Sequence, residues 1–391
     1  MQPDKPTYKR DDSFYFEDGS CIFLVENTLF NVHRSLLSRD SSSFTNMFTL
    51  PQGDKPVQGK SDDNPVLLLG DTVTEFKHFL WALYALPSEI AAVSSQFGDL
   101  TLLSDIAQVA NKYFFKSVET WALDVVYARV SRIQQRLKGV DSGTHTSPSF
   151  QLSKTGSSIP VDDIPMDQFT RLLRLSQICV HEPLLDAIVS ILSHSTKTSL
   201  QHAFRAMNIA DELDIPSLRG VAYLEVLQKC SIDNWIVPGF KQLTIMTSQR
   251  LSQSVQDKDS PSPDEELPEI TPAQRSRLLT GYYRMSRFWE RTRLTPPEFD
   301  HALACGATWH QRGCTLSWVE FWREKARSET ILNLDVADVL GKLRHIEKEY
   351  ARLGNTTYMH HDCRLMAKEC LAVAVKNIED NLYEFFSDPL L

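Results

Sequence analysis

The sequence predicts an α+β domain at the N-terminus followed by a long all-helical region. Short apolar runs separated by turn residues fill the first seventy positions, and from residue 101 onward apolar residues recur with helical spacing. Two polar stretches rich in Ser, Pro or acidic residues interrupt the pattern, and they lack the apolar content needed to become ordered. We therefore expect an α+β domain, a linker, helical hairpins, an acidic linker and a helical Trp-rich region, over residues 12–138, 139–163, 164–251, 252–269 and 270–391.

The N-terminal domain is expected to contain a small sheet covered by helices. CIFLV at 21–25 and LFNVH at 29–33 flank the turn residues Glu26-Asn27-Thr28, which predicts a hairpin. PVLLLGD at 65–71 is predicted to be a third strand ending at a Gly-Asp turn. The period then changes in EFKHFLWALYAL, where a helix would place five apolar residues on one face: Phe76, Phe79, Leu80, Leu83 and Tyr84.

One helical unit recurs along the chain. VANKYFFKSVETWALDVV (109–126) aligns without gaps on IADELDIPSLRGVAYLEV (209–226), and SQICVHEPLLDAIVSIL (176–192) is a weaker third copy. Each copy reads as a helix, a short turn and a second helix. Either duplication or the shared chemistry of helical hairpins explains the match, and both predict stacked hairpins.

The C-terminal region is predicted to be helical with its own core. TPAQ at 271–274 forms a capping box with proline at the first helical position, and further helices are expected around 316–327, 335–352 and 362–386. Four large rings are expected to build the core: Trp289, Trp309, Trp318 and Trp322. The first helix also carries an arginine face, interpreted as a solvated surface, a protein-binding surface or a phosphate-binding surface, formed by Arg277, Arg284, Arg287 and Arg291. The acidic linker before it is a candidate intramolecular partner.

Composition and charge limit the function classes. The net charge of −9 argues against a nucleic-acid or anionic-membrane footprint. No signal-peptide pattern and no run of 18 apolar residues appears, which predicts a cytoplasmic or nuclear protein. The seven scattered cysteines include no CxxC pair and are interpreted as reduced, buried residues.

The sequence contains no recognisable catalytic motif. GxSxG, HExxH, GxxxxGK[ST] and GxGxxG are all absent, and Cys179 near His181 is interpreted as core packing. Nitrogen and sulfur ligands for zinc occur in the C-terminal region, but their spacings match no standard finger: Cys305, His310, Cys314, His360, His361 and Cys363. We therefore assign no catalytic, cofactor-binding or metal-binding residue and expect a protein that is not an enzyme.

Three sequence motifs carry a family resemblance. Residues 30–48 read F-x-V-H-R-S-L-L-x-x-x-S-x-x-F-x-x-M-F, residues 66–71 read V-x-L-x-G-D, and residues 75–84 read E-F-x-x-F-L-x-A-L-Y. Together they resemble the BTB/POZ domain, and residues 102–126 look like the helix pair that closes it. With LPQGD (50–54) and LWALYALP (80–87), the chain is most similar to the BTB proteins abundant in fungi. The resemblance covers residues 12–130.

The resemblance implies a non-enzymatic protein-interaction module. Family members self-associate, or act as adaptors that bind a cullin scaffold while another region recruits a substrate for ubiquitin transfer. On that reading the helices around 75–86 and 101–126 form the docking face, with Tyr84, Leu86 and Phe115 as candidate contacts. An alternative is a transcriptional co-regulator acting by self- or hetero-association. A metal-dependent or cysteine-dependent enzyme is a remote third possibility.

The resemblance also implies a role for three motif residues in the fold or in self-association: His33, Arg34 and Asp71. Many family members that act in transcription pair this arginine with an aspartate fourteen residues earlier, but here that position is Ser20, with Asp18 nearby. The segment before the first predicted strand begins MQPDKP and is too short and polar for the N-terminal helix that long family members exchange. These two departures count against the swapped homodimer that is usual in the family.

Overall fold

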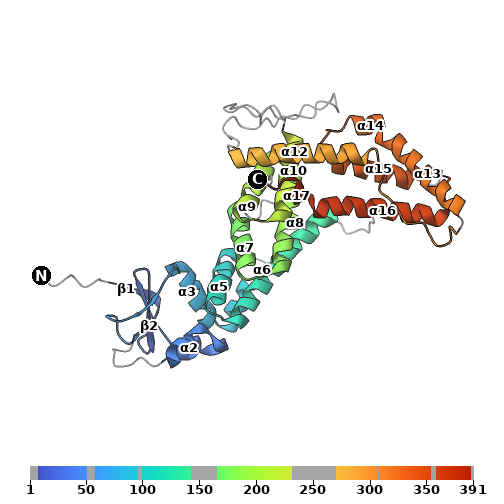
Figure 1. The fold of residues 1–391 in the computed structure, drawn as a ribbon. Coiled ribbons are helices and arrows are strands. Elements are labelled where there is room, and N and C mark those ends of the chain that lie inside the picture. The colour runs from blue at the N-terminus through green and yellow to red at the C-terminus, as the bar shows by residue number, and fades with distance from the viewer. Residues whose placement is uncertain are drawn as a thin grey trace, which may run out of the picture. The chain divides into compact units, whose positions relative to one another are not determined.

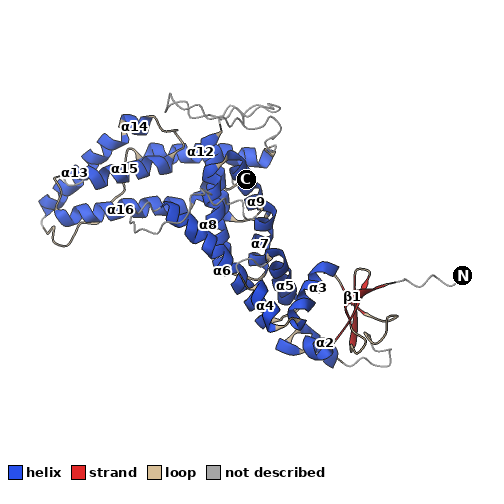
Figure 2. Cartoon of the chain, turned by 180° about the vertical axis from the view of Figure 1, so that it is seen from behind, coloured by secondary structure: helices blue, strands red, loops and turns tan. Residues whose placement is uncertain are grey.

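The computed structural model describes residues 8–50, 58–95, 99–141, 165–230, 270–306, 308–353 and 358–388. The protein is α+β, with a small mixed sheet near the N-terminus and helices in the rest of the described chain (Figures 1 and 2). It forms two compact units, residues 1–191 and 192–391. Within the described residues, no helix is long and apolar enough to cross a membrane.

The four strands of the sheet lie in the order β1-β3-β2-β4. Their bounds are β1 Lys9–Tyr15, β2 Cys21–Val25, β3 Thr28–Val32 and β4 Val66–Leu68. β2 and β3 form the predicted antiparallel hairpin, with Cys21 opposite Val32 and Val25 opposite Thr28. β1 pairs with β3 and β4 pairs with β2, both in parallel. The sequence KRDDSFY gave no apolar signal for β1, because an edge strand exposes most of its side chains.

Helices cover the sheet and continue from it along the chain. Their bounds are α1 Arg34–Leu37, η1 Arg39–Ser41, α2 Ser43–Thr49, α3 Val73–Tyr84, α4 Pro87–Val93, α5 Leu100–Lys112, α6 Lys116–Asp141, α7 Met166–Ile178 and α8 Glu182–Thr198. The core between sheet and helices is aromatic: Phe23, Phe30, Phe44, Phe76, Phe79 and Phe115 are all buried. Phe30 meets Phe76 edge-on with centroids 5.1 Å apart, an arrangement that the ring quadrupoles favour.

Three helical hairpins share one turn geometry. In α5–α6, in α7–α8 and in the hairpin of α9 (Leu200–Glu212) and α10 (Pro216–Lys229), a non-glycine residue adopts a positive φ. These residues are Phe114 (61°), Val180 (51°) and Asp214 (48°), which correspond in the three copies of the repeated unit. In each turn the next residue donates its N–H to the carbonyl five positions back, at 2.8, 2.8 and 3.0 Å, as in a Schellman cap. The sequence match therefore reflects a shared local structure.

The remaining helices lie in the C-terminal region, which was expected to be helical, although α14 was not among the predicted helices. Their bounds are α12 Pro272–Thr292, α13 Thr308–Ala326, α14 Glu329–Leu332, α15 Val339–Leu353, α16 His361–Asp380 and α17 Leu382–Phe385. The capping box before α12 is confirmed, because the N–H of Gln274 donates to the hydroxyl of Thr271 at 3.2 Å and the Gln274 side chain accepts in return. α13 begins eight residues before the predicted start at 316.

The expected tryptophan core is confirmed for three of the four rings. Trp289, Trp318 and Trp322 are buried, and the last two donate their indole N–H groups to backbone carbonyls of Pro297 and Thr292. The prediction is wrong for Trp309, whose side chain is 73% exposed in the first turn of α13, where it contacts the neighbouring His310 ring.

The predicted linkers fall largely outside the described residues, which omit 142–164 and 231–269. α6 continues to Asp141, past the expected domain end at residue 138. The boundary between the two compact units lies inside α8 and not in either predicted linker, so α7 belongs to the same unit as the sheet. Packing of α7 against α5 explains this, because it extends the core of the N-terminal domain.

Candidate functional site

His33 joins the sheet to the first helix. It lies between β3 and α1, its N–H donates to the Tyr84 hydroxyl at 3.0 Å, and its ring Nδ1 is 2.8 Å from the same hydroxyl. The other ring nitrogen, Nε2, lies 3.3 Å from the exposed carboxylate of Asp18. These contacts tie the junction of β3 and α1 to the end of α3.

Arg34 contacts a serine and an aromatic ring in the described part of the chain. Its backbone N–H donates to the hydroxyl of Ser20 at 2.8 Å, and its guanidinium lies over the Phe48 ring, 4.2 Å from the centroid. Asp18 contacts His33 instead. Ser20 thus contacts the backbone of Arg34, and the guanidinium is a cation–π partner of Phe48 in the same chain.

Asp71 is a buried carboxylate that ties the end of β4 to the end of α5. Lys112 lies 2.8 Å from one of its oxygens, and the Tyr113 hydroxyl donates to the other. Burial and the hydrogen bond to this carboxylate raise the pKa of Tyr113 well above its usual range. Both oxygens of Asp71 are thus satisfied internally, which suits a residue that holds the fold.

The three candidate docking residues have different environments. Tyr84 is half-buried against the rings of Phe14 and Phe16, with centroid distances of 6.0 and 4.9 Å. Leu86 is 63% exposed at the start of α4. Phe115 is only 1% exposed, so the expectation that its side chain contacts a partner is wrong: it follows the α5–α6 turn and points into the core.

The exposed aromatic ring at this turn belongs to the neighbouring residue, Phe114, which the sequence analysis did not select as a candidate contact. Its ring is 60% exposed, and its backbone is held at φ 61° by the cap of α5. The FF pair at 114–115 gave no basis for choosing between the two rings, because a positive φ after a helix has no clear signal in a non-glycine residue. Two leucines of β4 and its end are also exposed, Leu67 at 56% and Leu69 at 74%, and the Leu69 carbonyl accepts from Lys112 at 2.7 Å.

A buried polar centre links three helices of the N-terminal unit. Asp105 on α5 is 1% exposed, accepts from His78 on α3 at 2.7 Å and is bound by Arg171 on α7. Burial is the main reason that the pKa of His78 is lowered. Within the described residues no nucleophilic side chain hydrogen-bonds to His78. The contacts of Asp105 connect α3, α5 and α7.

Cys179 and His181 also have structural environments. Burial raises the pKa of Cys179 to about 12, which keeps the thiol protonated and poorly nucleophilic. The His181 ring accepts the N–H of Leu184 at 3.1 Å and packs on Tyr127 with centroids 5.6 Å apart. The interpretation of this pair as packing residues accounts for these contacts.

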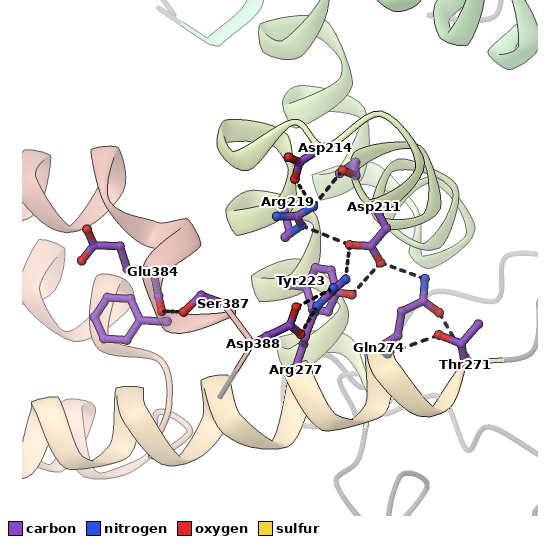
Figure 3. A network of polar contacts seen from close by, with 12 residues as sticks. Asp211, Asp214, Arg219, Tyr223, Thr271, Gln274, Arg277, Glu384, Ser387 and Asp388 are labelled. Atoms are coloured by element: carbon purple, nitrogen blue, oxygen red, sulfur yellow. Dashed lines mark hydrogen bonds and ion pairs between the residues drawn. The ribbon is translucent and has the colours of Figure 1, made fainter. Parts of the chain in front are cut away.

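Two arginines of the α12 face bind carboxylates or carbonyls of the same chain. Figure 3 shows Arg277 between two carboxylates: it donates to Asp211 at 2.8 Å and to both oxygens of Asp388 at 2.7 and 3.0 Å. Arg284 donates to the carbonyls of Glu384 and Ser387 at 2.7 and 3.2 Å. The interpretation as a solvated face is wrong for these two arginines. The acidic linker expected to pair with them lies outside the described residues.

The described surface contains several cavities, of which two are larger than 500 Å³. One of about 690 Å³ lies between the end of α4 and α6, where the Trp121 indole donates to the Ser94 hydroxyl at 3.2 Å. The other, of about 510 Å³, lies among α12, α15, α16 and α17 and is lined mainly by apolar groups, including Phe288, Leu343 and Phe385.

The C-terminal unit also contains a cluster of sulfur and nitrogen atoms. The side chains of His301, Cys305, Cys314 and Cys363 place one ligand atom each within 4.8 Å of the others. Three of these residues belong to the set considered as zinc ligands in the sequence. The histidine of the cluster is not one of those considered in the sequence but His301, whose only sequence signal is its position four residues before Cys305.

Comparisons with known proteins found no matching family model, no matching curated protein and no matching solved structure.

Proposed function

We propose that the chain is a protein-interaction adaptor, whose BTB-like N-terminal module docks a cullin-type scaffold and whose helical region recruits a second protein. Support comes from the placement of the motifs that carry the resemblance. They form one continuous arrangement of hairpin, β4, α3 and the α5–α6 pair, and their polar residues hold it together.

The exposure of Phe114 is the observation on which this proposal rests. Aromatic rings are common anchors in protein interfaces, and the Phe114 ring is 60% exposed at a rigid turn of the domain. Its backbone is fixed by the Phe115 N–H bond to Ala110 at 2.8 Å, so little conformational entropy is lost on binding. Exposed Leu67, Leu69 and Leu86 provide further apolar area on the same module.

The test is a calorimetric titration of the full chain with the N-terminal helical region of a cullin. Truncating an aromatic anchor typically loses about 2 kcal/mol, so Phe114→Ala should weaken binding about thirtyfold. Val180→Ala is the matched control, because Val180 occupies the same turn position in the next hairpin and is 81% exposed. Circular dichroism on each variant confirms that it is folded.

Two outcomes would overturn the scaffold-docking proposal. One is the absence of binding by the folded chain, and the other is equal weakening by the two substitutions. Light scattering on the same samples tests the co-regulator alternative, which requires stable self-association. The engagement of Arg34 with Phe48 in its own chain is the reason that we place that alternative second.

A further inference from the structure

The four ligand atoms of the sulfur-rich cluster lie within 4.8 Å of one another, close to the spacing of a tetrahedral metal site. The Sγ atoms of Cys305 and Cys314 are 4.0 Å apart, and the Cys363 Sγ is 3.7 Å from the His301 Nδ1. A tetrahedron with zinc–sulfur bonds of about 2.3 Å separates neighbouring sulfurs by about 3.8 Å. A zinc ion at the centre would therefore require only small side-chain movements.

Neighbouring groups orient two of these ligands. The Nε2 atom of His301 lies 3.1 Å from the Thr315 hydroxyl, which leaves Nδ1 directed at the thiols. The backbone N–H of His360 donates to the Cys314 Sγ at 3.3 Å. A partner for the second imidazole nitrogen and an N–H donor to sulfur are the outer contacts that metal-bound histidine and thiolate residues need.

Simple core packing explains this cluster less well. Cys305, Cys314 and Cys363 are 1%, 3% and 0% exposed, which ordinary hydrophobic packing allows. It does not account for a polar imidazole nitrogen from His301 placed among the three sulfurs. A disulfide between Cys305 and Cys314 would use two ligands and leave the other two unexplained.

We propose that His301, Cys305, Cys314 and Cys363 form a structural zinc site. Four protein ligands leave no open coordination position, so the site would be structural and not catalytic. It would tie together the loop before α13, α13 itself and the first turn of α16, which are otherwise separate in sequence. This site is independent of the adaptor function proposed for the N-terminal unit.

The test begins with elemental analysis of the full chain, purified without chelator. We expect about one zinc per chain, as a four-ligand site binds a single ion. Replacement by Co²⁺ should give the intense visible bands of a tetrahedral ion and thiolate-to-cobalt charge transfer in the near ultraviolet. Cys363→Ser should lose both the zinc and the charge-transfer band.

The matched control is Cys370→Ser, on the same helix but outside the cluster, where its thiol donates to the Glu298 carbonyl at 3.2 Å. This variant should retain one zinc. His301→Cys provides a test without ligand loss: it should keep the metal and increase the charge-transfer intensity, because a fourth thiolate replaces the imidazole.

Three results would overturn the proposal. They are a folded chain that contains no zinc and gives no tetrahedral cobalt spectrum, equal zinc content in Cys363→Ser and Cys370→Ser, and a Cys305–Cys314 disulfide found by mass spectrometry of the alkylated native protein. If Cys363→Ser fails to fold, His301→Cys and the cobalt spectrum of the unmodified chain still decide the question.

Discussion

Asp40 caps a helix that begins 76 residues after it. Its carboxylate accepts both the backbone N–H of Ser117, at 2.6 Å, and the Ser117 hydroxyl, at 2.9 Å, in the first turn of α6. Phe115, just before that helix, has no side-chain acceptor of its own. A residue of the α1–α2 connection therefore supplies a cap that the local sequence lacks, and its negative charge faces the positive end of the helix dipole.

We expect Asp40→Ala to lower the free energy of unfolding by about 1 kcal/mol, because it leaves a helix N–H without its acceptor. Asp40→Asn is the control: it keeps an acceptor oxygen and tolerates the φ of 62° at this position. Urea denaturation of the three proteins measures the difference. Equal stability of the alanine variant and the unmodified chain would contradict the capping role.

Val180 is a β-branched residue in the left-handed region, at φ 51°, with its side chain 81% exposed. Because this conformation costs an L-residue about 1–2 kcal/mol, Val180→Asn should stabilise the chain by about 1 kcal/mol. Little packing is lost in the exchange. Val373→Asn, at a half-exposed position within α16, is the comparison and should bring no gain. A lower thermal midpoint for Val180→Asn would show that the turn is not strained.

Gly281 allows the C-terminal segment to pack on α12. A Cβ at this position would overlap the ring of the fully buried Phe386. Gly281→Ala should therefore destabilise the C-terminal unit by about 1–3 kcal/mol, the usual cost of overpacking. Gly313→Ala on α13 is the matched control: no atom lies within 4 Å of its added Cβ, so helix propensity should make it neutral or stabilising. Chemical denaturation distinguishes the two, and equal effects would contradict the close approach.

The pKa of Asp11 predicts a pH dependence of stability. Burial alone would raise this pKa, but Lys77 at 2.9 Å and the N–H groups of Ser13 and Phe14, each at 3.0 Å, outweigh it and lower the pKa below its ordinary value. A lowered folded-state pKa contributes stability above the unfolded pKa of about 3.9, which is lost as the pH falls through the folded value.

Asp11→Asn should therefore be less stable than the unmodified chain at pH 7, and the difference should shrink below about pH 4. Denaturation measured at a series of pH values gives this difference directly. Asp12→Asn is the comparison, because Asp12 is exposed and its only described ion pair is a loose one with Lys9 at 3.7 Å. A difference that persists unchanged at low pH would mean that the charge of Asp11 is not responsible.

Local patterns predicted the elements whose causes are local. The β2–β3 hairpin, the amphipathic α3 and the Thr271–Gln274 capping box each depend on residues within a few positions of one another. β1 was missed because a charged segment becomes a strand only when β3 offers it a free edge. β3, with which β1 pairs, is too far along the sequence for a local pattern to reveal the pairing.

The positions of the site residues also depend on contacts between distant parts of the sequence. The sequence placed Phe115 on the surface, but the turn after α5 rotates that ring into the core and exposes Phe114. Likewise, His301 and Cys363 are 62 positions apart, and only the packing of α16 near the loop before α13 brings their ligand atoms to 3.7 Å. Residue type alone placed the three cysteines among the zinc ligands considered, because their spacings match no standard finger, and His301 joins them only in the tertiary structure.

The strand order β1-β3-β2-β4 also has a kinetic consequence. The hairpin of β2 and β3 closes across two residues, whereas β4 joins only after the chain from residue 26 to 65 has been traversed, at a higher loop-closure entropy. Both outer strands need an edge that the hairpin supplies, so the hairpin is the natural folding nucleus of this unit. Changes in its turn should slow folding, whereas changes in β1 should mainly accelerate unfolding.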